Sequence, residues 1–250
     1  MNDINCFNPC FCMSTQIKIN PDLDWDALKL EYQTTSRLQI QNFFTNDTAE
    51  YLLQLLQAHQ EWYLAYNHGN QFYESTLEDL QRLSPEQRHQ FKSNIEKRAQ
   101  NHFQYVFFQY YISQAIELGE NPNHPLHAFE DFVNSDVYLD KMRFLTAEEK
   151  INKADSYASY YAPGHFLSEH DDIHPKHDRV AACTFSLTKN WQLNWGGHLA
   201  FYDKQGNIDK ALIPAFNTMN VFKIPQSHAV QPVAPWAGAK RLSLLSWLHR

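Results

Sequence analysis

The chain has 250 residues, of which 43% are hydrophobic, so it is long enough for a substantial core and too apolar for a disordered protein. The formal net charge of −7 argues against direct binding to nucleic acid or to an acidic membrane surface. The sequence contains no apolar run of about 18 residues. Its first residues lack the layout of a secretion signal, so we expect a cytoplasmic protein without membrane contact.

Residues 1–20 are interpreted as an N-terminal tail. Cys6, Cys10 and Cys12 lie in this segment, but they form no CxxC pair and no second ligand pair follows at a suitable spacing. Reduced thiols in a flexible tail are therefore favoured over a zinc knuckle. Cys183 lies in an apolar run and is expected to be a small core residue.

Helical signals dominate residues 21–150. Within this range, a short strand is predicted at 37–41 from its alternating pattern. Thr45, Asn46 and Asp47 are candidate N-caps for the first of these helices, and Glu50 follows Asp47 at the spacing of a capping box.

Ser84 and Pro85 mark the start of a second helix, because serine is a favoured cap and proline is favoured at the first helical position. Further helices are predicted over 125–133 and after Ser135. The aromatic stretch 102–112 is interpreted as a strand, given its Tyr, Phe and Val content.

Beyond residue 150, short runs rich in β-branched and aromatic residues alternate with Gly, Pro, Asn and Asp. Such spacing is typical of a sandwich or barrel. No repeat or low-complexity linker interrupts the chain, so we expect a single domain over 21–250, with 21–150 mainly helical support packed on the sheet of 151–250. The predicted strands lie near 156–162, 165–170, 179–187, 198–203, 219–224, 227–233 and 240–248.

His170 and Asp172, with His228 further along the chain, form the most informative pattern in this region. Two histidines and one carboxylate are the ligand set of a mononuclear iron(II) site that keeps open coordination positions. Residues i and i+2 of a strand point the same way, so we expect His170 and Asp172 to project together from one strand end.

Arg241 and Ser243 share one face of the last predicted strand by the same rule. An arginine fork beside a hydroxyl can hold a carboxylate in a partly buried pocket. The pair therefore indicates a binding position for an acidic co-substrate near the metal.

The order of these motifs resembles the prolyl 4-hydroxylase branch of the iron(II)/2-oxoglutarate dioxygenases. Tyr161 and Gly164 precede the His-x-Asp motif, and Gly196-Gly197 begins a segment that ends in Phe201-Tyr202. Within that branch, the segments 212–217 and 241–249 are similar to the catalytic domain of the ribosomal prolyl hydroxylases. The motif-bearing resemblance covers about residues 157–249.

This resemblance implies an α+β fold, a double-stranded β-helix (jelly roll) with flanking N-terminal helices. It implies a protein or peptide substrate with a target proline, Fe(II) as cofactor, 2-oxoglutarate and O2 as co-substrates, succinate and CO2 as products, and ascorbate as a supporting reductant. His170, Asp172 and His228 would bind the metal, Arg241 would hold the distal carboxylate of 2-oxoglutarate with Ser243, and Tyr161 would line the pocket near it.

The chain departs from the branch at Ser186, which stands where related prolyl hydroxylases often carry a tyrosine that touches the same carboxylate. It also has no room for the second jelly roll of the ribosomal members.

Three other functions remain open. The same site would also suit a free amino acid or another small molecule as substrate. A zinc hydrolase would use the nearby histidines, which are His165, His174, His177 and His198. A non-catalytic jelly-roll binding module is the third, although it would have no need of all three metal ligands. Aromatic residues in the first half are compatible with a homodimer interface.

Overall fold

The computed structural model describes residues 16–250. Residues 1–15 of the expected tail, which include Cys6, Cys10 and Cys12, therefore lie outside the described residues. The α-helices are α1 (Trp25–Thr35), α2 (Asn46–Ala58), α3 (Leu77–Arg82), α4 (Pro85–Ala99), α5 (Ile112–Glu117), α6 (His127–Val133) and α7 (Asp136–Thr146), and Leu193–Trp195 forms a 3-10 turn.

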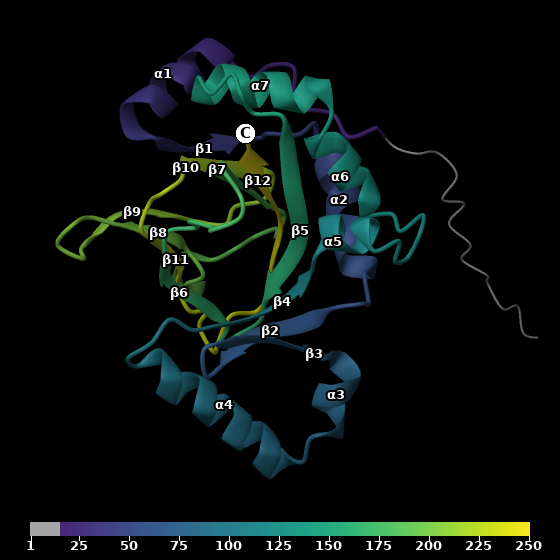
Figure 1. Ribbon diagram of the computed structural model, residues 1–250, viewed down its shortest axis with the longest axis vertical. Coiled ribbons are helices and arrows are strands. Elements are labelled where there is room, and N and C mark those ends of the chain that lie inside the picture. The colour runs from purple at the N-terminus through teal and green to yellow at the C-terminus, as the bar shows by residue number, and fades with distance from the viewer. Residues whose placement is uncertain (1–15) are drawn as a thin grey trace, which may run out of the picture.

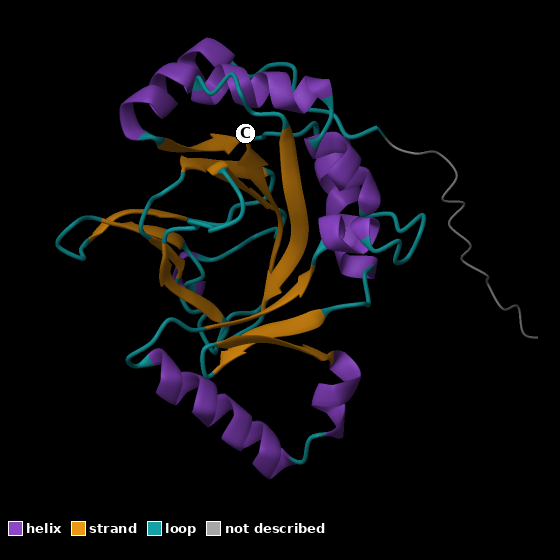
Figure 2. Cartoon of the chain, in the orientation of Figure 1, coloured by secondary structure: helices purple, strands orange, loops and turns teal. Residues whose placement is uncertain are grey.

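The strands form a strongly curved antiparallel sheet with the order β1-β10-β7-β12-β5-β4-β6-β11-β8-β9, to which β2 and β3 add beside β4 (Figures 1 and 2). This arrangement is a jelly roll with flanking helices, which confirms the predicted fold. The strands are β1 (Arg37–Gln41), β2 (Tyr63–His68), β3 (Gln71–Thr76), β4 (Tyr105–Tyr110), β5 (Lys153–Tyr161), β6 (Phe166–His170), β7 (Arg179–Ser186), β8 (Leu199–Tyr202), β9 (Ile208–Leu212), β10 (Thr218–Lys223), β11 (His228–Val230) and β12 (Arg241–His249).

The helices α2, α5 and α6 lie beside β5, α1 and α7 lie beyond one end of the strands, and α3 and α4 lie at the opposite end, beyond β2 and β3 (Figure 1). The main hydrophobic core lies between them, and Phe185 of β7 is one of its centres. Its ring lies 5.3–5.4 Å from the rings of Phe43, Phe44 and Phe129. The side chains on the other face of the same strands line the interior of the jelly roll.

The predicted helix starts are confirmed for α4 and α7, which are capped by the side chains of Ser84 and Ser135. For α2 the predicted Asp47–Glu50 capping box is wrong. Thr45 is the N-cap and accepts a hydrogen bond from the Thr48 backbone, which places Asp47 inside the first turn. Glu50 pairs instead with Lys189, at 2.6 Å.

The hairpin of β2 and β3 is the largest element that the sequence pattern did not indicate. Most side chains of β3 are exposed, so it lacks the alternation of buried and exposed positions that marks a half-buried strand. The short strand β9 was missed for the same reason, because only Leu212 in it is buried. The hairpin pairs with β4 and extends the sheet toward α3 and α4 (Figure 1).

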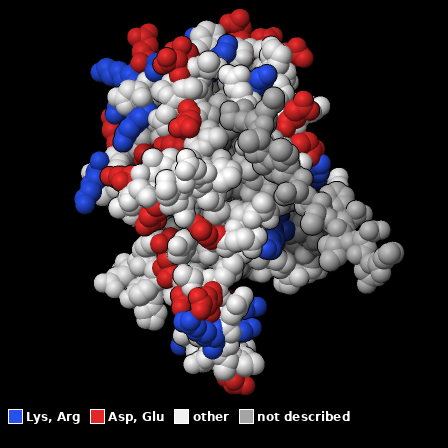
Figure 3. All heavy atoms as spheres, turned by 90° about the vertical axis from the view of Figure 1, so that its right-hand side faces the viewer, with Lys and Arg blue, Asp and Glu red and all other residues white. Residues whose placement is uncertain are grey.

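On the face shown in Figure 3, acidic and basic side chains are intermixed. Among the ion pairs of the described chain is Arg82 with Glu78, one helical turn apart in α3. None of the helices in residues 16–250 is both long enough and apolar enough to cross a membrane.

Candidate active site

The three predicted metal ligands meet at one end of the jelly roll. His170 at the end of β6 lies directly opposite His228 at the start of β11, and Asp172 follows two residues after His170. The Nε2 atoms of His170 and His228 lie 3.5 Å and 3.4 Å from the two carboxylate oxygens of Asp172. One ligand atom from each residue lies within 4.8 Å of the other two, so a single metal ion can contact all three.

Asp172 reaches the site by a route that differs from the strand geometry we expected. Strand β6 ends at His170, and Asp172 has a φ of +63°, in the left-handed region of backbone conformation. The reversal at this residue, rather than alternation along a strand, brings its carboxylate back to His170. A non-glycine residue pays a conformational penalty of about 1–2 kcal/mol there, although aspartate tolerates it better than most.

Both histidines are oriented by backbone carbonyl groups. Nδ1 of His170 lies 3.0 Å from the Ser168 oxygen, and Nδ1 of His228 lies 2.7 Å from the Gln226 oxygen. A carbonyl oxygen can only accept, so each Nδ1 carries the hydrogen and donates it. In the neutral imidazole this leaves the lone pair on Nε2, which is the atom that faces Asp172.

The electrostatics of the triad favour an ionised carboxylate. Burial alone would raise the pKa of Asp172, but its contacts with His170 and His228 hold that pKa well below its ordinary value. Burial would lower the pKa of His170, and the adjacent Asp172 outweighs burial and raises it. A bound metal ion would be a positive partner for this carboxylate and would contact the Nε2 lone pairs of the two neutral imidazoles.

Arg241 is the most unusual residue of the interior. Its side chain is 2% exposed, and no carboxylate of the described residues lies within 4 Å of the guanidinium. Its Nη1 donates a hydrogen bond to Ser243 Oγ at 3.3 Å, while Nε has no hydrogen-bond partner in the structure. A buried cation without an acidic partner is costly, so this position fits an acidic ligand.

Hydroxyl groups from the two neighbouring strands flank Ser243. The antiparallel register places Ser159 of β5 on one side of it and Ser186 of β7 on the other. Both flanking side chains are fully buried, and neither Oγ has a hydrogen-bond partner among the described residues. These orphaned hydroxyls match the oxygens of a small dicarboxylic acid. Sequence reasoning singled out Ser186 but missed Ser159, which only the strand register reveals.

A cavity of about 170 Å³ connects the arginine with the triad, and His170, Asp172, His228 and Arg241 all line it. Tyr161 lies opposite Arg241 in the register of β5 and β12, and its ring is 5.1 Å from the guanidinium carbon. The remaining wall is mainly apolar and aromatic, with contributions from Tyr105, Phe107, Tyr157, Leu167, Val230, Leu245 and Trp247.

The adjacent glycines Gly196 and Gly197 lie in a turn that passes close to the Arg241 side chain. Gly196 and Gly197 both have a φ of +65°. A Cβ on Gly197 would lie 3.4 Å from Arg241 Cδ and 3.1 Å from the Trp191 ring, so the bare backbone makes room for the buried arginine.

The other histidines of this region lie outside the triad. His165 packs on Phe108, and burial lowers its pKa to about 4. His174 and His177 lie together in the loop after β6, with ring centres 4.4 Å apart. His198 contributes its backbone oxygen to a bond from Gln231.

A jelly roll that brings two histidines and one carboxylate to a shared point beside a buried arginine defines a class of metal-dependent oxygenase. The segment 156–249, which holds all of these residues, matches the family model described as the 2OG-Fe(II) oxygenase superfamily. The matched segment is thus similar to a 2OG-Fe(II) oxygenase domain, which is a domain of oxidoreductases, and it holds the candidate metal ligands.

Several solved structures share the fold at low sequence identity. A prolyl-4-hydroxylase from Pseudomonas putida is 16% identical, with a TM-score of 0.54 over 90% of this chain and 98% of that one. A prolyl hydroxylase from Trichoplax adhaerens, solved with a hypoxia inducible factor peptide, is 15% identical, with a TM-score of 0.57 over 90% and 88%. A 2OG-Fe(II) oxygenase family oxidoreductase from Burkholderia pseudomallei is 12% identical, with a TM-score of 0.57 over 93% of each chain. No curated protein matches the sequence.

Proposed function

We propose that this protein hydroxylates a prolyl residue of a protein or peptide, using Fe(II), 2-oxoglutarate and O2. The observation that carries the oxygenase assignment is Arg241, a buried guanidinium without an acidic partner, which opens onto the cavity lined by the His170, Asp172 and His228 triad.

The donor set fits Fe(II), and His170, Asp172 and His228 are the residues that would hold it. Arg241 and Ser243 would hold the distal carboxylate of 2-oxoglutarate. When bound, iron and 2-oxoglutarate supply the oxidising chemistry, in which 2-oxoglutarate, O2 and a C–H bond become succinate, CO2 and an alcohol.

The chain itself orients the candidate metal ligands and surrounds the cavity with apolar side chains. The carbonyls of Ser168 and Gln226 fix the imidazole rings before a metal arrives, which lowers the cost of assembling the site. The apolar wall strengthens the attraction between Arg241 and a carboxylate, because apolar side chains screen charges less than bulk water does.

Aromatic side chains at the mouth of the cavity support a prolyl substrate. Phe72 of the β2–β3 hairpin lines the cavity and is 56% exposed. Phe103 is 45% exposed, and its ring lies 5.9 Å from His170. Such rings offer a flat apolar surface to a pyrrolidine ring, and one similar fold was solved with a peptide bound.

The test is succinate formation by purified protein with Fe(II), 2-oxoglutarate and ascorbate, with and without prolyl peptides. Iron-dependent turnover that rises with a peptide, together with a mass gain of one oxygen on its proline, is the expected result. Turnover that rises only with free amino acids would assign a small-molecule substrate instead. A protein that binds neither iron nor 2-oxoglutarate would be a binding module.

The ligand assignment has its own test in the variants His170→Ala, Asp172→Ala and His228→Ala. Each should lose more than 99% of 2-oxoglutarate turnover, because a facial triad with a missing ligand holds iron weakly and in the wrong geometry. Circular dichroism should show the fold intact. Full turnover in any one of them would refute the assignment of that residue.

A further inference from the structure

A second group of metal-ligating side chains lies at the end of β12 opposite to Arg241. It consists of Asp155 on β5, His177 in the loop between β6 and β7, and His249 on β12. One ligand atom of each lies within 4.8 Å of the others, and the group shares no residue with the iron triad. We propose that these three residues bind a second divalent transition-metal ion, with Zn²⁺ as the best chemical match.

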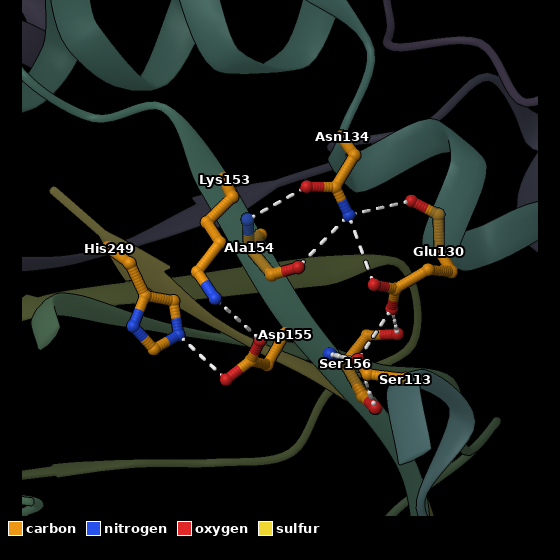
Figure 4. Close-up of polar contacts among 8 residues, drawn as sticks. All are labelled: Ser113, Glu130, Asn134, Lys153, Ala154, Asp155, Ser156 and His249. Atoms are coloured by element: carbon orange, nitrogen blue, oxygen red, sulfur yellow. Dashed lines mark hydrogen bonds and ion pairs between the residues drawn. The ribbon is translucent and has the colours of Figure 1, made fainter. Parts of the chain in front are cut away.

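His249 provides the strongest indication of a ligand. The residue is 1% exposed, and its Nε2 lies 2.8 Å from Asp155 Oδ2 without the alignment of a hydrogen bond. Figure 4 shows the ring and the carboxylate facing each other. The ring nitrogen and the carboxylate oxygen face each other at close range without an aligned hydrogen bond, and a metal ion contacting both atoms would satisfy them together.

Asp155 is held rigidly in place by its neighbours on β5, which point toward the helices (Figure 4). Asn134 accepts a hydrogen bond from the Ala154 backbone nitrogen and donates one to the Ala154 oxygen, both at 2.9 Å. Ser156 donates from its hydroxyl to Glu130. Because residues on both sides of Asp155 are anchored, its carboxylate is preorganised toward His249.

His177 completes the set from an exposed loop, with its ring centre 5.6 Å from that of His249. Two imidazoles and one carboxylate form a common zinc donor set, which leaves a fourth position for water. The nearest cation to Asp155 is Lys153, whose Nζ lies 3.9 Å from Oδ1 and leaves Oδ2 facing His249. Arg179 stacks on the Trp247 ring, at 3.8 Å.

A metal ion at this position would tie the loop 171–178 to the sheet. That loop begins directly after His170, with Asp172 near its start and His177 near its end. The second site would therefore restrain the segment from which the iron triad takes its carboxylate.

Equilibrium dialysis against Co²⁺, a spectroscopic substitute for Zn²⁺, tests the proposal on the full chain. The His177→Ala protein should bind one cobalt fewer than the wild type and should lose the absorption of a four-coordinate ion. His177 is exposed, so the substitution should not disturb folding. The matched control is His89→Ala, which removes an exposed histidine on α4 and should leave the count unchanged.

A second variant, Asp155→Asn, should lose the same single equivalent. His170→Ala reports separately on the iron triad and should lose the other equivalent, so a failure of the proposed function does not hide the outcome here. Equal cobalt binding by the wild type and by His177→Ala would overturn the second site, and so would a wild type whose only bound cobalt depends on His170.

Discussion

Arg241 carries its charge in a place where an isolated ion costs several kcal/mol. Within the described residues this charge has a hydrogen bond to the hydroxyl of Ser243 and lies over the face of Tyr161, without a carboxylate partner within 4 Å. The arrangement is unfavourable for a protein that binds nothing there, and it becomes favourable when a dicarboxylic acid enters. In the proposed function, the arginine would thus select for the charge of the co-substrate.

The variant Arg241→Gln should raise the KM for 2-oxoglutarate by about 10- to 100-fold, because it removes charge-assisted hydrogen bonds of about 1.5–3 kcal/mol. Iron binding should persist, since the triad lies elsewhere in the cavity. Steady-state succinate formation at varied 2-oxoglutarate concentration measures the effect. An unchanged KM would exclude a role for this arginine in holding the co-substrate.

The residue types of the site could be predicted from the sequence, but their exact routes to it could not. His170, Asp172, His228 and Arg241 stand in a recognisable order, and the structure brings all four to one cavity. The left-handed turn at Asp172 leaves no signature in the order of residues. The same holds for the group of Asp155, His177 and His249, whose members come from two strands and a loop far apart in the chain.

At the level of elements, the turn at Gly196 controls how the segment before β8 passes the loop after β11. Gly196 has a φ of +65° and a ψ of −142°, a conformation that is essentially restricted to glycine. A Cβ at this position would lie 2.3 Å from the Pro232 oxygen.

Gly196→Ala should therefore lower the free energy of unfolding by about 3 kcal/mol or more, since backbone strain and a steric clash add. Urea denaturation followed by circular dichroism measures the change. Gly206→Ala is the matched control, because that glycine also has a positive φ but has open space around it, so it should lose only the strain. Equal losses in the two variants would show that the contact with Pro232 is relieved at no cost.

His59 links the end of α2 to the sheet and to the loop before α6. It is 6% exposed, and its Nδ1 lies 3.1 Å from His124 Nε2. Burial, reinforced by the nearby His124, lowers the pKa of His59 to about 4. The folded protein therefore keeps this ring neutral at a pH where the unfolded chain already binds a proton.

The stabilising effect of the neutral ring is fully present above pH 6.5 and is lost as the pH falls from 6.5 toward 4, for a total of about 3 kcal/mol. In this pH range, the unfolding free energy of the wild type should rise with pH. The His59→Gln variant should show a slope that is smaller than the wild-type slope by up to about 1.4 kcal/mol per pH unit. Urea titrations at several pH values measure the slope. His89→Gln on exposed α4 should keep the wild-type slope, and a wild-type slope in His59→Gln would contradict the prediction.

Most elements could be predicted because their signals are local. Cap residues marked α4 and α7, and dense β-branched or aromatic runs marked β5, β7 and β12. The β2–β3 hairpin could not be predicted, because its strands are held by pairing with β4 and β3 buries little of its side-chain surface. The hairpin forms because β2 pairs with β4, which lies some forty residues further along the chain, and a local sequence pattern does not contain that pairing.

For the molecule as a whole, the site connects parts of the chain that would otherwise be held only by the sheet. The candidate metal ligands come from β6, from the loop that follows it and from β11, and Arg241 comes from β12 in the facing layer. A metal and 2-oxoglutarate bound together would therefore bridge the two layers of the jelly roll, and binding energy would add to the stability of the native state.

Saturating Mn²⁺, used as a redox-inert substitute for Fe(II), together with 2-oxoglutarate should raise the melting temperature by several degrees. Binding at about 100 times Kd contributes about 2.7 kcal/mol, and each kcal/mol is worth about 2–4 °C in a chain of this size. Differential scanning fluorimetry should show a smaller rise with Mn²⁺ alone and a reversal with EDTA. A 2-oxoglutarate effect that does not need the metal would contradict joint binding.

Strand β12 occupies the centre of the sheet, between β5 and β7, yet it follows every other described strand in the chain. On a ribosome, β5 and β7 are made first, and each must wait with one edge unpaired until β12 emerges. The same nine residues bring Arg241. Pairing of β12 thus closes the barrel and places Arg241 inside it in a single event, and the unpaired edges persist until then as sites for chaperone capture or aggregation.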